Sequence, residues 1–179
     1  MFAFGSNLDE SQMRRRCPSA SAIGVATLPN HRLAFLGWSA YRAGAVASVL
    51  PAAERDVPGL MYRMTRHDVT RLDAYEGGDY RRVRVAVRPL ALGWSSGSLT
   101  VETYMMDPKT PEGLPSLDYL GQIAIAYGKL GLPKSALVEA ARWHRDEGEL
   151  PPVKKARPKQ LGLAYGKGLK YRHYYSGTR

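Results

Sequence analysis

The sequence predicts an α+β fold in which strands pair with neighbouring strands more often than they alternate with helices. Apolar runs bounded by Pro, Gly or charged residues predict strands over residues 22–28, 32–36, 45–50 and 59–64. Helices are predicted before this series, after it and towards the end of the chain. Because strand–helix alternations are few, a largely antiparallel or mixed sheet is favoured over a doubly wound parallel one.

The first sixteen residues predict a short strand, a loop and a short helix. Phe2-Ala3-Phe4 is apolar and runs into the loop Gly5-Ser6-Asn7-Leu8. Asp9 is a suitable N-cap for a helix that continues to Arg16. Successive backbone N–H groups in such a loop, just before a helix N-terminus, can bind a carboxylate or an oxyanion.

Residues 65–106 predict a capped helix followed by a β-hairpin. Thr65-Arg66-His67-Asp68 resembles a capping box, with Asp in place of the usual Glu, and the helix is expected to end near Tyr75, before Gly77-Gly78. Alternating Arg and Val predict a half-buried strand. The remaining expected elements are that strand over 81–87, its hairpin partner over 99–106, and helices over 116–130 and 134–146.

The positive charge is concentrated at one end of the chain. The 179 residues carry a net charge of +10, yet residues 1–150 hold only +2 of it and residues 151–179 hold +8 with no acidic residue. We therefore expect a domain over 1–150 and a basic, Tyr-rich extension over 151–179. The extension is expected to pack on the body or on a second subunit, to bind nucleic acid or another acidic partner, or to remain solvated.

Composition argues against several classes of protein. A single cysteine, Cys17, excludes an intrachain disulfide and any zinc site that needs two thiolates. The four histidines are scattered without a His-x-x-x-His pair, so we expect no metal and no cofactor. No apolar run approaches 18 residues and no signal peptide is visible, so we expect no membrane partner and a cytoplasmic location.

Glu76 is the most informative acidic residue. It closes a predicted helix, where the helix macrodipole disfavours a negative charge and tends to raise the pKa of a carboxyl. Tyr75 and Tyr80 flank it in the sequence. Taken alone, a solvated glutamate at a helix end is the more common situation, because most perturbed acids are structural.

Two separated motifs change that weighing, because together they resemble the γ-glutamylcyclotransferase family and its AIG2-like relatives. The first is the strand-loop over residues 2–8, and the second is Leu72-Asp73-Ala74-Tyr75-Glu76-Gly77, some seventy residues later. The similarity covers about residues 1–142 and includes Val46-Ala47-Ser48-Val49, Thr103-Tyr104 and Tyr119. Phe4 stands where the family commonly has Tyr, so a hydroxyl is missing there.

The resemblance implies a γ-glutamylcyclotransferase-like fold, with a β-barrel-like sheet flanked by helices, and an enzyme that needs no cofactor. Such enzymes fold a small γ-glutamyl amide so that its own α-amine attacks, releasing 5-oxoproline and a free amine or amino acid. By this resemblance Glu76 is the general base and acid, and the substrate-binding residues are Gly5, Ser6, Asn7, Leu8, Tyr80 and Tyr119. The alternative is a non-catalytic module of the same fold that binds a small acid and whose basic extension binds nucleic acid.

Overall fold

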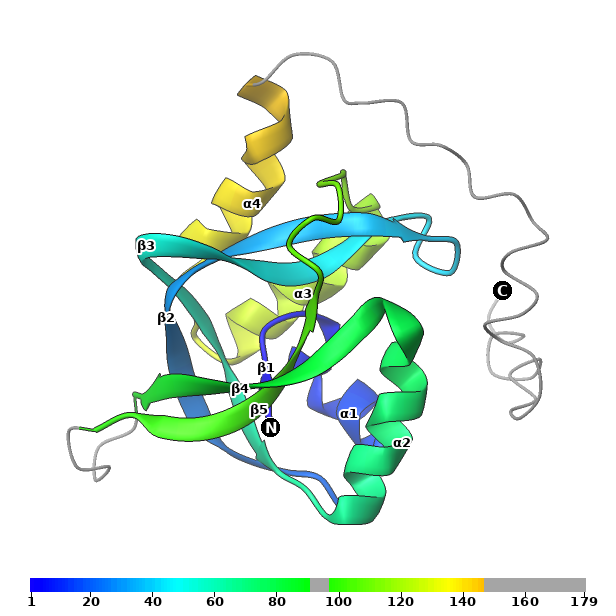
Figure 1. Cartoon of the computed structure of the whole chain (residues 1–179), viewed down its shortest axis with the longest axis vertical. Coiled ribbons are helices and arrows are strands. Elements are labelled where there is room, and N and C mark those ends of the chain that lie inside the picture. The colour runs from blue at the N-terminus through cyan, green and yellow to red at the C-terminus, as the bar shows by residue number, and fades with distance from the viewer. Residues whose placement is uncertain (91–96, 147–179) are drawn as a thin grey trace.

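The computed structural model describes residues 1–90 and 97–146 (Figure 1). The expected basic extension over 151–179 lies outside the described residues, so the division into a domain and an extension stays a prediction. None of the helices in the described part of the chain is long and apolar enough to cross a membrane.

The described chain follows the predicted order of strand, helix, strands, helix, hairpin and helices. Its elements are β1 (Phe2–Ala3), η1 (Ser6–Leu8), α1 (Glu10–Arg16), β2 (Ser21–Ser39), β3 (Gly44–Arg63), α2 (Arg66–Glu76), η2 (Gly77–Asp79), β4 (Tyr80–Pro89), β5 (Leu99–Met106), α3 (Leu117–Lys129) and α4 (Ser135–Asp146), where η marks a 3₁₀-helix. This order confirms the α+β class.

The five strands form one sheet in the order β1-β3-β2-β4-β5, and every neighbouring pair is antiparallel. The two edges of the sheet approach each other, since the Thr103 hydroxyl on β5 donates to the Phe2 carbonyl on β1 over 2.8 Å. No backbone ladder joins β1 to β5 within the described residues. The sheet is therefore strongly curled, and it is barrel-like without being closed into a barrel.

The prediction of four short strands over residues 22–64 is wrong, because they form two long ones, β2 and β3 (Figure 1). The expected break near Pro29 is a bulge: the register moves from Pro29 opposite Asp56 to His31 opposite Pro51. Asn30 and Glu54 take positive φ angles of 57° and 59° at this bulge. Irregular residues of this kind bend a strand without ending it, which the local sequence does not reveal.

Caps fix the ends of the helices that flank the site. The Asp9 carboxylate accepts the Ser11 N–H over 3.0 Å at the start of α1. Thr65 and Asp68 form a reciprocal capping box at the start of α2, with both N–H···O distances at 3.1 Å. Gly77, with φ 64°, ends α2 as predicted. These caps confirm the predicted helix ends and place Glu76 in the last turn of α2.

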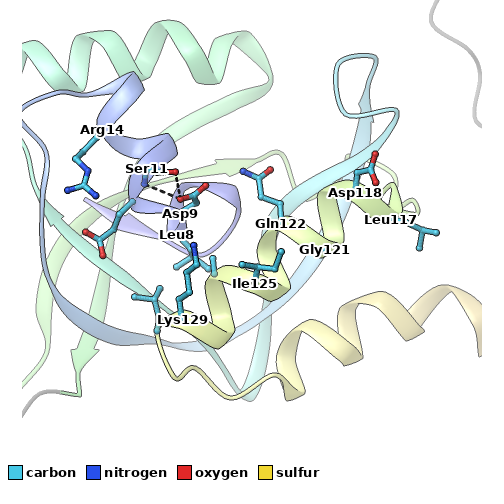
Figure 2. A pocket seen from close by; sticks show the side chains of 13 residues that line it. Leu8, Asp9, Ser11, Arg14, Leu117, Asp118, Gly121, Gln122, Ile125 and Lys129 are labelled. Carbon is cyan, nitrogen blue, oxygen red and sulfur yellow. Dashed lines mark hydrogen bonds between the residues drawn. The ribbon is translucent and has the colours of Figure 1, made fainter. Parts of the chain in front are cut away.

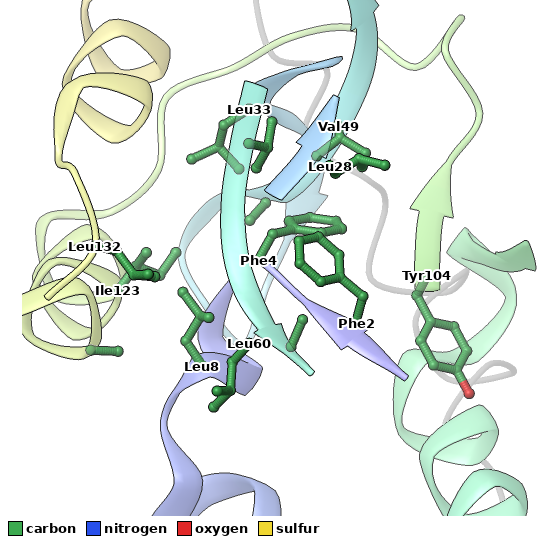
Figure 3. Packing of buried hydrophobic residues seen from close by; sticks show 14 of the residues in the cluster. Phe2, Phe4, Leu8, Leu28, Leu33, Val49, Leu60, Tyr104, Ile123 and Leu132 are labelled. Atoms are coloured by element: carbon green, nitrogen blue, oxygen red, sulfur yellow. The ribbon is translucent and has the colours of Figure 1, made fainter. Parts of the chain in front are cut away.

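The main hydrophobic core lies between the curled sheet and α3 (Figure 3). It joins β1, β2 and β3 to η1, α3 and the turn before α4; its members include Phe2, Phe4, Leu8, Leu28, Leu33, Val49, Leu60, Ile123 and Leu132. The ring of Phe4 is 5% exposed and packs beside Phe2, with ring centroids 6.4 Å apart. Because residues on both sides of Gly5-Ser6-Asn7 are anchored in this core, the turn between them is held in place.

Candidate active site

A narrow pocket of about 50 Å³ lies where the turn after β1, the middle of β3, the end of α2 and the start of α3 meet. Six of the seven residues predicted for the site line it: Gly5, Ser6, Asn7, Glu76, Tyr80 and Tyr119. The seventh, Leu8, does not line this pocket; its side chain is only 1% exposed and belongs to the core (Figure 3). The fold thus brings together residues that are far apart in the sequence.

The Glu76 carboxylate is held inside this pocket by two groups from the N-terminal segment. Asn7 Nδ2 donates to Glu76 Oε1 over 2.8 Å, and Arg16 Nη1 lies 3.8 Å from the same oxygen. Burial raises the pKa of Glu76 above its usual value, and the charge of Arg16, the Asn7 hydrogen bond and the charge of Arg42 offset part of the rise. The direction matches the sequence argument, but burial is the main cause and not the helix macrodipole.

The Asn7 side chain has only one orientation that satisfies its neighbours. Its Oδ1 accepts from Arg16 Nη1 over 2.7 Å and from Gln12 Nε2 over 3.4 Å, so its Nδ2 faces Glu76. The Tyr62 hydroxyl donates to the Asn7 carbonyl over 3.0 Å and fixes the backbone as well. Asn7 therefore links α1 to the Glu76 carboxylate on α2 and holds the two in a fixed relative position.

The backbone of the turn offers N–H groups on one side of the pocket. Leu8 N–H already donates to the Gly5 carbonyl over 3.0 Å, whereas the first N–H groups of a 3₁₀-helix, here those of Ser6 and Asn7, have no partner within that helix. A Cβ added to Gly5 would lie 2.9 Å from the Cβ of Ala47. Glycine is needed at this position because β3 passes so close to the turn.

The two pocket tyrosines both bind the backbone of Ala47 on β3. The Tyr80 hydroxyl donates to the Ala47 carbonyl over 2.8 Å, and the Ala47 N–H donates to the Tyr119 hydroxyl over 3.2 Å. Strand β1 pairs with β3 only at Met61 and Leu60, so it does not cover this part of the strand. The hydroxyls take the place of the missing strand neighbour, and both tyrosines line the same pocket as Glu76.

Arg42 lies beside this pocket, in the turn that joins β2 and β3. Its guanidinium carbon is 4.8 Å from the centroid of the Tyr119 ring, and its Nη2 is 3.5 Å from Ser6 Oγ. It also donates to Gln12 Oε1 over 3.1 Å and to Gln122 Oε1 over 2.8 Å. Arg42 thereby joins the turn after β1 to α1 and α3.

A second, larger groove of about 660 Å³ lies on the other side of η1, between the start of α1 and α3 (Figure 2). Its wall on α3 presents Leu117 and Ile125, which are 85% and 61% exposed, and the amide of Gln122. Acidic and basic side chains both occur around it, including Asp9, Asp118, Arg14 and Lys129. Gln122 lines this groove and also accepts a hydrogen bond from Arg42, so Arg42 lies next to the groove.

Four polar residues of the site were not predicted from the sequence: Gln12, Arg16, Arg42 and Gln122. A usable signal existed for Gln12 and Arg16, which are four residues apart and so share one face of α1. None existed for Arg42, because its partners are 30 to 80 residues away along the chain. Among the described residues, no three His, Cys, Asp or Glu side chains gather to offer a metal site.

Comparison with known proteins identifies the family of this chain. Residues 1–121 match the family model described as "Gamma-glutamyl cyclotransferase, AIG2-like". A mouse (Mus musculus) protein named Gamma-glutamylcyclotransferase is 27% identical over 140 residues, which cover 74% of this chain and 72% of the relative.

Solved structures show the same fold. One named Gamma-glutamyl cyclotransferase has a TM-score of 0.68 at 24% identity, and a human protein titled as uncharacterized has a TM-score of 0.67 at 24% identity. Both comparisons cover 91% of this chain and 95% of the other. Since the family model alone spans well over half of the sequence, this chain belongs to the AIG2-like γ-glutamyl cyclotransferase family.

Proposed function

We propose that this protein is an active γ-glutamyl cyclotransferase. It would convert a γ-glutamyl amide into 5-oxoproline and a free amine or amino acid, with Glu76 as the general base and then the general acid. The observation that carries the proposal is the largely buried Glu76 carboxylate, held by Asn7 within the pocket that Gly5, Ser6 and Asn7 also line.

The pKa of Glu76 suits this dual role. A carboxyl that transfers a proton twice works best when its pKa lies closer to neutrality than that of an ordinary glutamate, and burial moves the pKa of Glu76 in that direction. Arg16 and Asn7 limit the rise, so that the ionised form needed for the first step remains accessible. Proton transfer by a positioned side chain typically accelerates a reaction by about 10²–10⁴-fold.

In the proposed reaction the α-ammonium group of the substrate gives one proton to the Glu76 carboxylate. The freed amine attacks the γ-carbonyl carbon, a five-membered ring closes, and the electron pair of the carbonyl moves onto its oxygen. Collapse of this oxyanion breaks the bond to the leaving nitrogen, which takes the proton back from Glu76. The ring nitrogen then loses its second proton, which the released amine takes up, and the carboxylate of Glu76 is restored.

The rest of the pocket would act by holding the substrate folded. Ring closure is intramolecular, and well-oriented intramolecular reactions reach effective molarities of about 10⁵–10⁸ M. The N–H groups of Ser6 and Asn7 are suitable donors for the α-carboxylate or the developing oxyanion. The wall that Tyr80 and Tyr119 form on Ala47 would keep the glutamyl chain against Glu76.

Release of 5-oxoproline from a panel of γ-glutamyl amides and dipeptides tests the proposal. Glu76→Gln keeps the size of the side chain and an oxygen that can accept from Asn7, but it cannot exchange a proton. We expect its kcat to fall by about 10²-fold or more. Asp79→Asn, an exposed acid three residues away, is the matched control and should keep wild-type activity.

Two results would contradict the proposal. Equal turnover by wild type and Glu76→Gln would remove Glu76 from the chemistry. Failure of the wild-type protein to release 5-oxoproline from every compound on the panel would instead favour a non-catalytic module that binds a small acid.

A further inference from the structure

We propose that residues 165–175, in the basic part of the chain that follows α4, dock in the larger groove between α1 and α3. This segment holds four tyrosines and three cationic residues, and it has no acidic residue. The inference commits the predicted basic extension to packing on the body of its own chain. It concerns a surface outside the pocket that holds Glu76, and it does not depend on the proposed reaction.

The groove has an apolar floor that the described residues leave open (Figure 2). Leu117 and Ile125, which line it from one side of α3, are 85% and 61% exposed. Gly121 lies between them, and a Cβ added there would meet no described atom within 4 Å. Glycine is unfavourable in the middle of a helix, and no described residue needs the space above it. The groove, at about 660 Å³, therefore has room for aromatic rings over an apolar surface.

The charged side chains around this floor suit a basic segment. Asp9, Glu10 and Asp118 line the groove, and no ion pair joins any of them to a cation of the described residues. Arg14 and Lys129 line it as well, so three acids against two cations give this surface a net charge of −1. The surface thus opposes the charge of the body, which is +2 over residues 1–150. An apolar floor with an acidic excess at its border is complementary to a segment built of tyrosines and cations.

The chain between α4 and this segment is long enough to reach the groove. Helix α4 ends at Asp146, and residues 147–164 connect it to the segment. A chain of that length spans up to about 60 Å, whereas a folded domain of this size has a radius of gyration of about 15 Å. Because the segment is tethered, its effective concentration at the groove is about millimolar, and contacts too weak for a separate molecule suffice. This favours the extension over a second copy of the chain as the occupant.

The groove lies next to the active site without being part of it. Gln122 lines the groove and accepts from Arg42 over 2.8 Å. Arg42 in turn stacks on the ring of Tyr119, which lines the pocket. A docked segment therefore rests against the outer side of the residues that support the pocket, and it leaves the pocket itself open.

Thiol labelling of the full-length protein measures whether the segment covers the groove. Ile125→Cys places a reactive thiol on the floor, while the native Cys17 is buried and does not compete. Replacing Tyr171, Tyr174 and Tyr175 by Ser removes three anchors of the segment and leaves its charge unchanged. A covered thiol reacts in proportion to the fraction of time that it is open, so we expect this replacement to speed the labelling by about tenfold or more.

Val138→Cys is the matched control, because Val138 is 41% exposed on α4 and does not line the groove. Its labelling rate should be the same with and without the three tyrosines. In a second measurement, Ile125→Cys combined with Tyr174→Cys should form a disulfide within one molecule at least about ten times faster than Val138→Cys combined with Tyr174→Cys.

Three results would overturn the inference. The first is an unchanged labelling rate at Ile125→Cys when the tyrosines are replaced. The second is an equal acceleration at Val138→Cys, which would show that the segment does not choose the groove. The third is labelling that slows as the protein concentration rises, with disulfides that form only between molecules, which would assign the groove to a second copy of the chain.

Discussion

Two tyrosines on α3 allow one chemical change to be compared in two environments. Tyr119 and Tyr127 are 5% and 0% exposed. The Tyr119 hydroxyl accepts the Ala47 N–H, but the Tyr127 hydroxyl is buried and has no hydrogen-bond partner among the described residues. Replacing each by Phe removes one oxygen and keeps the ring, so the difference between the variants reports on the hydrogen bonds of the Tyr119 hydroxyl, which involve Ala47 and Ser6.

The expected magnitudes follow from these contacts. Tyr119→Phe leaves the N–H of Ala47 buried without an acceptor, which costs about 1–3 kcal/mol of the free energy of unfolding. Tyr127→Phe removes a buried polar atom that forms no bond with the described residues, so we expect no loss or a gain of up to about 1 kcal/mol. For a protein of this size, 1 kcal/mol corresponds to a change of about 2–4 °C in Tm.

Urea denaturation of the two variants and the wild type, followed by circular dichroism, measures both changes on one scale. An unchanged dependence on urea would show that the denatured state is the same in all three. The reasoning is refuted if Tyr127→Phe destabilises the protein as much as Tyr119→Phe does. It is also refuted if Tyr119→Phe costs less than about 0.5 kcal/mol, because Ala47 would then not depend on the hydroxyl.

Three further predictions concern the pocket. Gly5→Ala brings a Cβ to 2.9 Å from that of Ala47 and should lower the free energy of unfolding by about 1–3 kcal/mol, measured in urea; an unchanged midpoint would contradict the close approach. Arg16→Met removes the largest influence that lowers the pKa of Glu76, so 5-oxoproline release should fall more at low pH than at high pH. A loss of activity that is the same at every pH would contradict this reasoning. Glu76→Gln should raise Tm at pH 7–8, because a buried acid with a raised pKa stabilises the fold only while protonated and loses that contribution as pH rises through its folded pKa. The difference in Tm between the variant and the wild type should shrink towards pH 4. A difference in Tm that stays constant with pH would contradict this linkage.

The local sequence was sufficient for features that depend on neighbouring residues. Asp9, the box from Thr65 to Asp68, and Gly77 each act within one or two helical turns, so their types identified the ends of α1 and α2. The hairpin of β4 and β5 followed from its alternation, and its observed register runs from Tyr80 opposite Met106 to Val87 opposite Leu99. These predictions needed no knowledge of the tertiary fold.

The sequence was insufficient where distant segments determine the outcome. Pro29 and Asn30 look like a break, but pairing with β3 carries β2 through them as a bulge. The role of the Tyr80 and Tyr119 hydroxyls depends on Ala47, because β1 is too short to cover that part of β3. Arg42 belongs to the site only because the turn between β2 and β3 folds onto α3.

The charges of the pocket are better explained by chemistry than by stability. Burying ionised groups has a desolvation cost that their mutual attraction often fails to offset, and apolar residues of similar volume are frequently as stable or more so. Glu76 shows that cost directly, because burial raises its pKa although Arg16 and Asn7 both favour the ionised form. The core around Phe2, Phe4 and Ile123 already joins the same elements by apolar packing. A carboxylate kept beside that core, with its amide partner held in one orientation by Arg16, therefore has the properties that the proposed proton transfer requires.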